Sequence, residues 1–282
     1  MKKSMEKKKR INARTIVMYV FLVVMGLIFA MPMAFTLLSS VKTKAQIFAN
    51  PFSLPEVPKF SNYIVAWVEA NMSRYFINSI LQAGATVIIL AVAATMAAYV
   101  LSRFDFKGSK FLLLFFTIGM MIPMHTVLVP ISYLIGAMNL KNNIGALVLI
   151  YVAFSLPFSI LVMTNFMKGI NQSLEEAAVI DGASYFQIYR KVMIPLSVPA
   201  ISTISIFNFL SAWNNILFPL LFINNKNLKP ISLGLLNFNG ERGSDYGPLM
   251  AAIVITVFLP LVLYLLFQEK VEGGLTAGAV KG

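Results

Sequence analysis

Six long stretches without any Asp, Glu, Lys or Arg dominate this chain of 282 residues. A helix rises about 1.5 Å per residue, so about 20 apolar residues cross the roughly 30 Å hydrocarbon core of a bilayer. Inside lipid each backbone amide needs a partner in its own segment, which makes helices the expected structure. The predicted spans are Ile16–Leu38, Ile77–Leu101, Phe111–Ile135, Ile144–Met167, Ile194–Ile223 and Pro248–Phe267.

The composition agrees with an all-α polytopic membrane protein of six transmembrane helices. Hydrophobic residues make up 58% of the chain and charged residues 12%, which leaves too little polar surface for a water-soluble globule. The second span carries Ala91, Ala94, Ala97 and Ala98, a spacing that lets another helix approach closely. Prolines in several spans, such as Pro123 and Pro157, predict kinks.

Basic residues set the expected orientation. Residues 1–15 are rich in Lys and Arg directly before the first span, so by the positive-inside rule they form a cytoplasmic tail. Six spans then return residues 269–282 to the cytoplasm as a second tail, with residues 16–268 as the transmembrane domain. The net charge of +12 comes from short segments between apolar runs, which argues against nucleic-acid binding. A cleaved signal peptide at the first span is a weaker alternative, because that apolar run is too long.

The residue inventory excludes several chemistries. The chain has no Cys and one His, so disulfides, thiolate sites and multi-histidine metal sites are ruled out. We expect no catalytic residues and no metal site. The pattern G-x-x-x-x-G-K-[ST] does not occur, so the chain carries no phosphate-binding loop of that type.

The long polar interval between the fourth and fifth spans, residues 168–195, is here called the elbow. Ser173 and Glu176 have the spacing of a capping box, which predicts a helix that ends near Gly182. Ser184 and Gln187 repeat that spacing and predict a second helix limited by Pro195. Two amphipathic helices on the cytoplasmic side are suited to docking another protein, although a connector lying on the membrane surface is the alternative.

The elbow resembles the EAA loop of binding-protein-dependent ABC importer permeases. That family's pattern is EAA, three residues, Gly, nine residues and then Ile-x-Leu-Pro; here it is Glu176-Ala177-Ala178, Gly182 and Val192-Met193-Ile194-Pro195, with conservative changes at Val192 and Ile194. The resemblance implies the type I ABC importer permease fold and a coupling helix that sits in a cleft of an ATPase subunit. The implied coupling residues are Glu175, Glu176, Ala177, Ala178, Asp181, Gly182, Ala183, Tyr185 and Pro195.

Two further stretches resemble carbohydrate permeases of the maltose and multiple-sugar type. They are Phe207–Asn215 with Phe218-Pro219-Leu220, and the tail Gly274–Gly282; the layout is similar to the shorter permease of the pair. The resemblance implies a multi-pass subunit of the cell membrane. Its implied partners are a second permease in a heterodimer, two ATP-binding cassette subunits that hold ATP and Mg, and an extracellular or periplasmic solute-binding protein. This chain itself would bind no cofactor.

Three groups of site residues follow from this resemblance. The tail is expected to contact the ATPases through Gly274, Thr276, Gly278 and Lys281, although a flexible end is the alternative. The loop after the fifth span is rich in turn formers and is expected to contact the binding protein through Asn237, Asn239, Gly240, Glu241, Asp245 and Tyr246, unless it is a solvated connector. The candidates for a substrate path within the membrane are Gln82, His125, Asn208, Trp213, Asn214 and Asn215, although polar groups in spans also serve as interhelical hydrogen bonds.

Three other functions compete with an importer permease. A secondary transporter usually has an ionisable residue at mid-membrane, and the six predicted spans contain no Asp, Glu, Lys or Arg. An intramembrane enzyme would need a nucleophile with its base or a zinc motif, which a single His and no buried carboxylate do not supply. A membrane scaffold would not need the spacing of the elbow.

Overall fold

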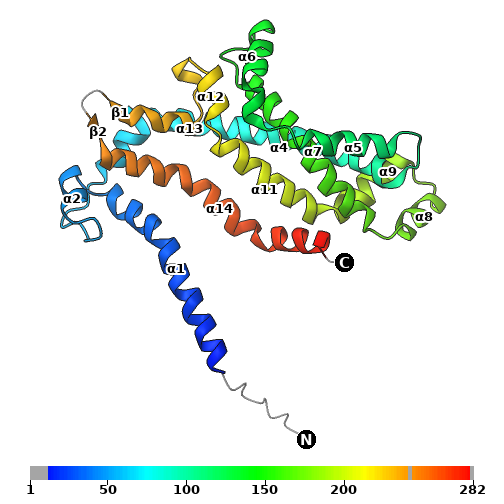
Figure 1. Ribbon diagram of the computed structural model, residues 1–282, viewed down its shortest axis with the longest axis horizontal. Coiled ribbons are helices and arrows are strands. Elements are labelled where there is room, and N and C mark those ends of the chain that lie inside the picture. The colour runs from blue at the N-terminus through cyan, green and yellow to red at the C-terminus, as the bar shows by residue number, and fades with distance from the viewer. Residues whose placement is uncertain (1–11, 241–242, 280–282) are drawn as a thin grey trace, which may run out of the picture. The chain divides into compact units, whose positions relative to one another are not determined.

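The structure is a computed structural model that describes residues 12–240 and 243–279. It is built of helices, with one short strand pair (Figure 1). The chain forms two compact units. Unit 1 comprises Met1–Ala66 and Phe238–Val254, and unit 2 comprises Trp67–Asn237 and Ile255–Gly282, in each case as far as the chain is described.

Unit 1 is organised around a buried lysine. Its elements are α1 (Ala13–Ser40), α2 (Lys44–Ala49), α3 (Ser61–Ile64), the antiparallel strands β1 (Asn239–Gly240) and β2 (Gly243–Ser244), and the start of α14 (Tyr246–Ala279). The π-helix η1 (Val65–Glu69) leads from unit 1 into unit 2. Lys42 is fully buried, and its Nζ donates hydrogen bonds to the carbonyls of Asn50 and Pro51 at 2.9 and 2.8 Å. These hydrogen bonds offset the cost of burying the ammonium group. They also hold the segment that follows α2 against the end of α1.

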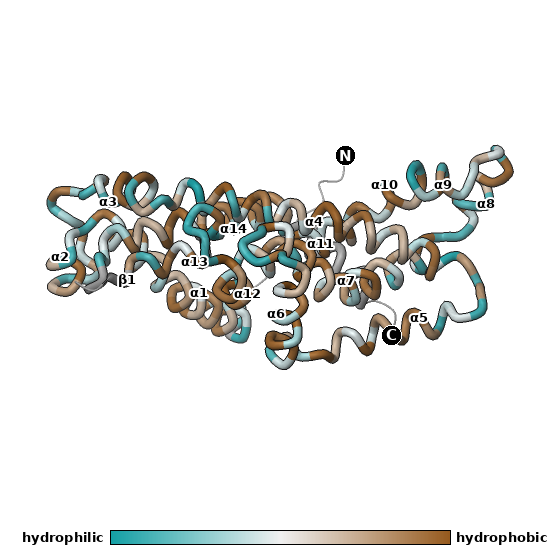
Figure 2. The backbone as a smooth tube through the Cα atoms, turned by 90° about the horizontal axis from the view of Figure 1, so that it is seen from above, coloured by the Kyte–Doolittle hydropathy of each residue, from teal (hydrophilic) through white to brown (hydrophobic). Residues whose placement is uncertain are grey.

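Unit 2 is a helical bundle with short elements at both of its ends. Its elements are α4 (Met72–Arg103), α5 (Ser109–Gly119), η2 (Met124–Val127), α6 (Leu128–Ala137), α7 (Ile144–Lys168), α8 (Ser173–Ile180), α9 (Tyr185–Ile188), η3 (Tyr189–Met193), α10 (Ile194–Leu196), α11 (Val198–Asn214), α12 (Leu217–Phe222), η4 (Lys226–Leu228), α13 (Ile231–Gly234), η5 (Leu235–Phe238) and the rest of α14. In Figures 1 and 2, α8 and α9 lie at one end of this bundle, and α12 and α13 lie at the other.

The core of unit 2 lies where α4 packs against α7 and α11. Ala94 and Ala98 of α4 are fully buried and pack with Ile160 and Met163 of α7. The close helix contact predicted from the small residues of the second span is therefore confirmed. Figure 2 shows hydrophobic residues along most of the long helices and hydrophilic ones mainly in the connections.

Four helices of the described chain are long and apolar enough to span a membrane, and two bent helix pairs raise this to six if each pair is one span. The four are α1, α4, α7 and α14, which agree with four of the predicted windows. The predicted window Phe111–Ile135 is not one straight helix, because α5 and the segment Met124–Ala137 meet at 87°. The helix ends before Pro123, which lacks a backbone N–H and keeps the residue before it out of the helical conformation.

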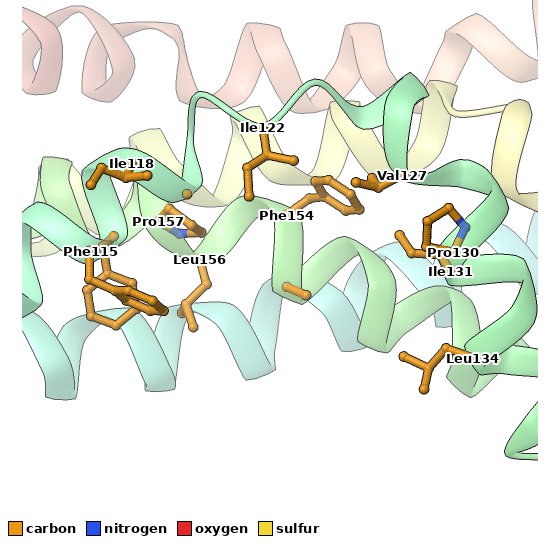
Figure 3. Close-up of a pocket in the computed structure, with 13 residues that line it drawn as sticks. Phe115, Ile118, Ile122, Val127, Pro130, Ile131, Leu134, Phe154, Leu156 and Pro157 are labelled. Carbon is orange, nitrogen blue, oxygen red and sulfur yellow. The ribbon is translucent and has the colours of Figure 1, made fainter.

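The α5–α6 bend leaves an apolar pocket of about 550 Å³ beside α7. Figure 3 shows Phe115 and Ile118 of α5, Pro130 and Ile131 of α6 and Phe154 of α7 around it, together with other apolar side chains.

The predicted window Ile194–Ile223 is also wrong as a continuous helix. The segment Tyr185–Leu196 meets α11 at 74°. Helix α11 ends at Asn214 and α12 begins at Leu217, so two residues separate them. Asn215 causes the second break, because its side-chain Oδ1 accepts a hydrogen bond from the Phe218 amide at 3.2 Å and so starts a new helix. Hydropathy does not detect this break, since the window around it is mostly apolar and contains no charged residue.

Candidate functional site

The first helix of the elbow, α8, begins differently from the prediction. Asn171 supplies the capping oxygen, since its Oδ1 accepts from the Ser173 amide at 3.1 Å. Ser173 is the first residue of α8 and makes no side-chain cap, so the predicted capping box of Ser173 with Glu176 is wrong. Asn171 precedes Ser173 by two residues and is an equally good cap in sequence terms. Glu176 is consequently free of a capping role, and its side chain is exposed.

The predicted turn at Gly182 is confirmed. The Ala183 amide donates to the Ala178 carbonyl and the Gly182 amide to the Val179 carbonyl, both at 2.9 Å, which is the hydrogen-bond pattern of a Schellman motif. Gly182 has φ +79°, a conformation that costs other residues roughly 1–2 kcal/mol. Nothing lies within 4 Å of where its Cβ would be, so the backbone conformation alone requires glycine.

The second half of the elbow is anchored in the bundle. Ser184 and Gln187 form the predicted capping box, with the Ser184 amide donating to Gln187 Oε1 at 2.8 Å. The chain continues from α9 as a π-helix, η3, into α10, where Pro195 lies in the first turn. Ile188 and Met193 are buried among residues of α4 and α7. This half of the elbow therefore moves with the bundle.

The first half of the elbow is held by a charged side chain from α4. Arg103, the last residue of α4, forms an ion pair through its Nε with Glu175 Oε1, and its Nη2 donates to the Ile170 carbonyl at 2.9 Å. The two side chains are only 10% and 11% exposed. No other ion pair within 4.0 Å is found in the part of the chain that the structure describes. Arg103 was not among the predicted site residues; its position directly after an apolar window was the available signal.

The surface of the elbow has a pocket lined by both charged and apolar side chains. A pocket of about 440 Å³ lies between α8, α9 and the end of α4, with Arg103, Glu175 and Glu176 in its lining. Phe104 and Tyr185 close one side, with ring centroids 5.1 Å apart. Val179 and Ile180 of α8 also line the pocket, and they are 54% and 86% exposed. Such residues on a polar loop are typical of a surface that another protein covers.

The implied coupling residues therefore differ in their surroundings. Glu175 faces inward to Arg103, whereas Ala178 and Ala183 are half-buried against the bundle. Pro195 lies in α10. The remaining members are exposed and available to a partner: Glu176, Ala177, Asp181, Gly182 and Tyr185.

At the other end of α4, hydrogen bonds to uncharged acceptors hold the loop that follows α12. Asn78 Nδ2 donates to the carbonyls of Asn227 and Lys229, both at 2.9 Å, and Arg74 donates to the Asn227 side chain. Asn237, one of the residues implied to contact a binding protein, donates to the Tyr75 hydroxyl at 3.1 Å and accepts from Lys229 Nζ at 3.0 Å. Asn237 is thus fixed within unit 2.

The other residues implied to contact a binding protein belong to unit 1. Asn239 and Gly240 form β1, and the Asp245 carbonyl accepts from the Leu249 amide at the start of α14. The Tyr246 ring lies 5.1 Å from that of Phe48, edge to face. Glu241 lies outside the described residues.

The six candidates for a substrate path divide into two groups. Gln82, Asn208 and Trp213 are buried and bonded within the bundle. Gln82 Nε2 donates to the Ala212 carbonyl at 3.1 Å, Asn208 Nδ2 to Ser159 Oγ at 3.0 Å and Trp213 Nε1 to the Thr256 carbonyl at 3.2 Å. These are interhelical hydrogen bonds, which were the alternative to a role of these three residues in the substrate path.

The other three path candidates lie at the two helix breaks. His125 is exposed in η2, and Asn214 is exposed at the end of α11. Asn215 lies next to η2, with its Nδ2 3.9 Å from Met124 Sδ. The α5–α6 break therefore lies next to the α11–α12 break, and the two breaks place an imidazole and an amide on the surface of the bundle.

The C-terminal segment is helical where it is described. Helix α14 continues to Ala279, so Gly274, Thr276 and Gly278 lie on it, whereas Lys281 lies outside the described residues. A search of the described residues for three or more clustered His, Asp or Glu side chains finds no candidate metal site.

Comparison with known proteins identifies the family. Residues 91–276 match the family model of the binding-protein-dependent transport system inner membrane component. The diacetylchitobiose uptake system permease protein NgcG of Streptomyces coelicolor is 33% identical over 93% of this chain and 88% of its own length. A putative ABC transporter permease protein, ORF2, of a Caldicellulosiruptor species is 36% identical over 94% of this chain and 96% of its own length.

The fold is also shared with a solved structure. A chain of a bacterial ABC transporter involved in the import of the acidic polysaccharide alginate superposes with a TM-score of 0.82 at 23% identity, covering 93% of this chain and 97% of that one. With the apolar spans and the family match together, this chain is a multi-pass membrane protein that belongs to the family of binding-protein-dependent transport system inner membrane components.

Proposed function

We propose that this chain is one permease subunit of an ABC importer and that its substrate is a carbohydrate. In this proposal a solute-binding protein delivers the substrate, a second permease completes the pathway, and two ATPase subunits supply the energy by hydrolysing ATP with Mg. The names of the Streptomyces and alginate proteins, which refer to sugar uptake, support the substrate class. The lack of an ATP-binding motif in the sequence supports an external motor.

The observation that carries this proposal is that one half of the elbow is packed into the bundle while the other half is exposed. Its second half is packed into the bundle through Ile188 and Met193. Its first half presents Val179, Ile180 and Glu176 outward at the polar end of a membrane protein. A partner that binds the exposed half can therefore push on the spans. A scaffold protein would have the exposed surface without needing the anchored half.

In this arrangement the elbow and both tails are cytoplasmic, as the basic residues of the sequence predict. Glu176 would pair with a basic group of the ATPase, and the end of α14 with Lys281 would reach towards the two ATPases. The loop with Asn237 would face the binding protein on the opposite side of the membrane.

The breaks in the spans support a shorter list of residues for the proposed substrate path. We assign His125, Asn214 and Asn215 to it, because they lie at the α5–α6 and α11–α12 breaks, which are in contact through Met124 and Asn215. Interrupted helices are common around substrate sites in membrane transporters, since free backbone groups there line a cavity. Gln82, Asn208 and Trp213 act behind this surface as packing residues.

Reconstitution tests the proposal. The complex with its second permease, ATPases and binding protein is placed in liposomes, and sugar uptake and ATP hydrolysis are measured together. Uptake that requires ATP and the loaded binding protein is expected. Glu176→Lys should abolish uptake while membrane insertion persists, and Asp105→Lys, a change of an exposed carboxylate beyond α4, should not. Uptake driven by an ion gradient without ATP would refute the proposal in favour of a secondary transporter.

A further inference from the structure

The first helix of the elbow, α8, makes few buried contacts with the bundle apart from those of one side chain. Of the eight residues of α8, Glu175 is the one that the structure buries. Ala178 touches the core only partly, and the apolar side chains of Val179 and Ile180 point outward. The attachment of α8 to the spans therefore depends on what Glu175 meets.

Glu175 meets Arg103, and this arginine makes two contacts at once. Its Nε pairs with the Glu175 carboxylate, and its Nη2 bonds to the Ile170 carbonyl, three residues before α8 begins. The planar guanidinium thus joins α8, the segment leading into it and the last turn of α4. A lysine ammonium is a single point charge and lacks this fixed fork.

The second half of the elbow does not need such a tie. The buried side chains of Ile188 and Met193 hold it, and the Tyr189 hydroxyl lies 2.8 Å from Thr95 Oγ1 of α4. Both halves are therefore attached to α4, one by apolar packing and a hydroxyl pair, the other by a buried ion pair. The turn at Gly182 joins the two halves, so α8 would pivot there if the ion pair were broken.

We propose that Arg103 is a positioning residue that fixes α8 to the end of α4 through Glu175, so that a force on the exposed face of α8 moves the spans. This rests on the proposed function, because it assumes that an ATPase pushes on α8. The two neighbouring glutamates then have separate tasks: Glu176 faces the partner, and Glu175 transmits the force inward. Without the ion pair, a force on α8 would displace α8 alone and would not be transmitted to α4.

The main test compares coupling with assembly. Complexes carrying Arg103→Gln, Glu175→Gln or Arg103→Lys are reconstituted, with Lys110→Gln as the control because Lys110 is an exposed basic residue of the next helix. Sugar transported per ATP hydrolysed is expected to fall about tenfold or more in the Gln variants, while ATPase subunits still co-purify. Arg103→Lys should recover part of the coupling. The exchanged pair Arg103→Glu with Glu175→Arg should couple better than either single reversal.

A distance measurement tests the tie without using transport. The chain has no cysteine, so spin labels can be placed at Ser173→Cys in α8 and Met96→Cys in α4 of the full complex. The distance distribution between them should broaden in Arg103→Gln and stay narrow in Lys110→Gln. Wild-type coupling with a narrow distribution in Arg103→Gln would overturn the inference, as would an exchanged pair no better than the single reversals. A wild-type complex that neither transports sugar nor responds to its binding protein would instead refute the proposed function, and the distance measurement would still test the tie.

Discussion

At its C-terminal end α4 is held by a buried ion pair, and at its N-terminal end by hydrogen bonds to uncharged groups of a loop. Arg103 pairs with Glu175, whereas Asn78 bonds to the carbonyls of Asn227 and Lys229. Leaving one buried charge without its partner costs about 3–5 kcal/mol, and a typical hydrogen bond contributes about 0.5–1.5 kcal/mol. Removing one partner is therefore expected to cost more at the Arg103 end than at the Asn78 end, which sets the path of a surface loop.

The largest effect is expected from Arg103→Ala. It leaves the Glu175 carboxylate buried without a partner and should lower the free energy of unfolding by about 3 kcal/mol. Denaturant unfolding of the purified protein in detergent measures this. The double variant Arg103→Ala with Glu175→Leu should be more stable than Arg103→Ala alone. Equal free energies of unfolding for Arg103→Ala and the control Lys110→Ala would show that the ion pair does not stabilise the protein.

Gly234→Ala should have the next largest effect, at the opposite end of α4. The added Cβ would lie 2.3 Å from Cδ2 of Tyr75, so the ring or α13 must shift, at a cost of about 1–3 kcal/mol. The unfolding midpoint should fall accordingly. Gly84→Ala is the matched control, because nothing lies within 4 Å of its Cβ position in α4. A Gly234→Ala protein as stable as Gly84→Ala would contradict the tight packing of Tyr75.

Asn78→Ala should loosen the loop more than it destabilises the protein. Both carbonyls that it caps lose their donor, a cost of about 1–2 kcal/mol because water can replace part of each bond. Hydrogen exchange of the amides from 225 to 237 should accelerate, while exchange in the elbow stays unchanged. Ser73→Ala, a neighbouring change in the same helix, serves as the control. Faster exchange in the elbow would show that the two ends of α4 are not independent.

The smallest effect is expected from Arg74→Ala. Its side chain is exposed and bonds to a neutral amide of Asn227, so its loss should cost less than about 1 kcal/mol. Unfolding measured at low and high salt should differ little between this variant and wild type. A loss as large as that of Arg103→Ala would erase the contrast between the two ends of α4.

Patterns that depend on neighbouring residues were readable in the sequence. Hydropathy located the spans α1, α4, α7 and α14, and the elbow pattern located the turn at Gly182 and the cap at Ser184. Two local predictions were wrong, because equally good local partners competed. Asn171 caps α8 in place of Ser173, and Asn215 interrupts an apolar run that hydropathy reads as continuous.

Roles that depend on residues far apart in the chain could not be read in this way. Glu175 and Glu176 are adjacent and chemically identical, and only the position of Arg103 makes one of them an internal partner. Trp213 was a candidate for the substrate path, yet its ring packs against Phe76 and Phe209. His125 and Asn214 gained importance because their two helix breaks meet.

The sequence by itself determined that this chain is a bundle of membrane helices with a two-part elbow, because the cost of placing charges and backbone amides in lipid and the conformational freedom of glycine act locally along the chain. The tertiary structure alone decided which polar side chains face a partner and which hold the bundle together. The physical reason is that burial and pairing of a side chain depend on what the fold brings beside it, as the arginine at the end of α4 shows for the glutamate of α8.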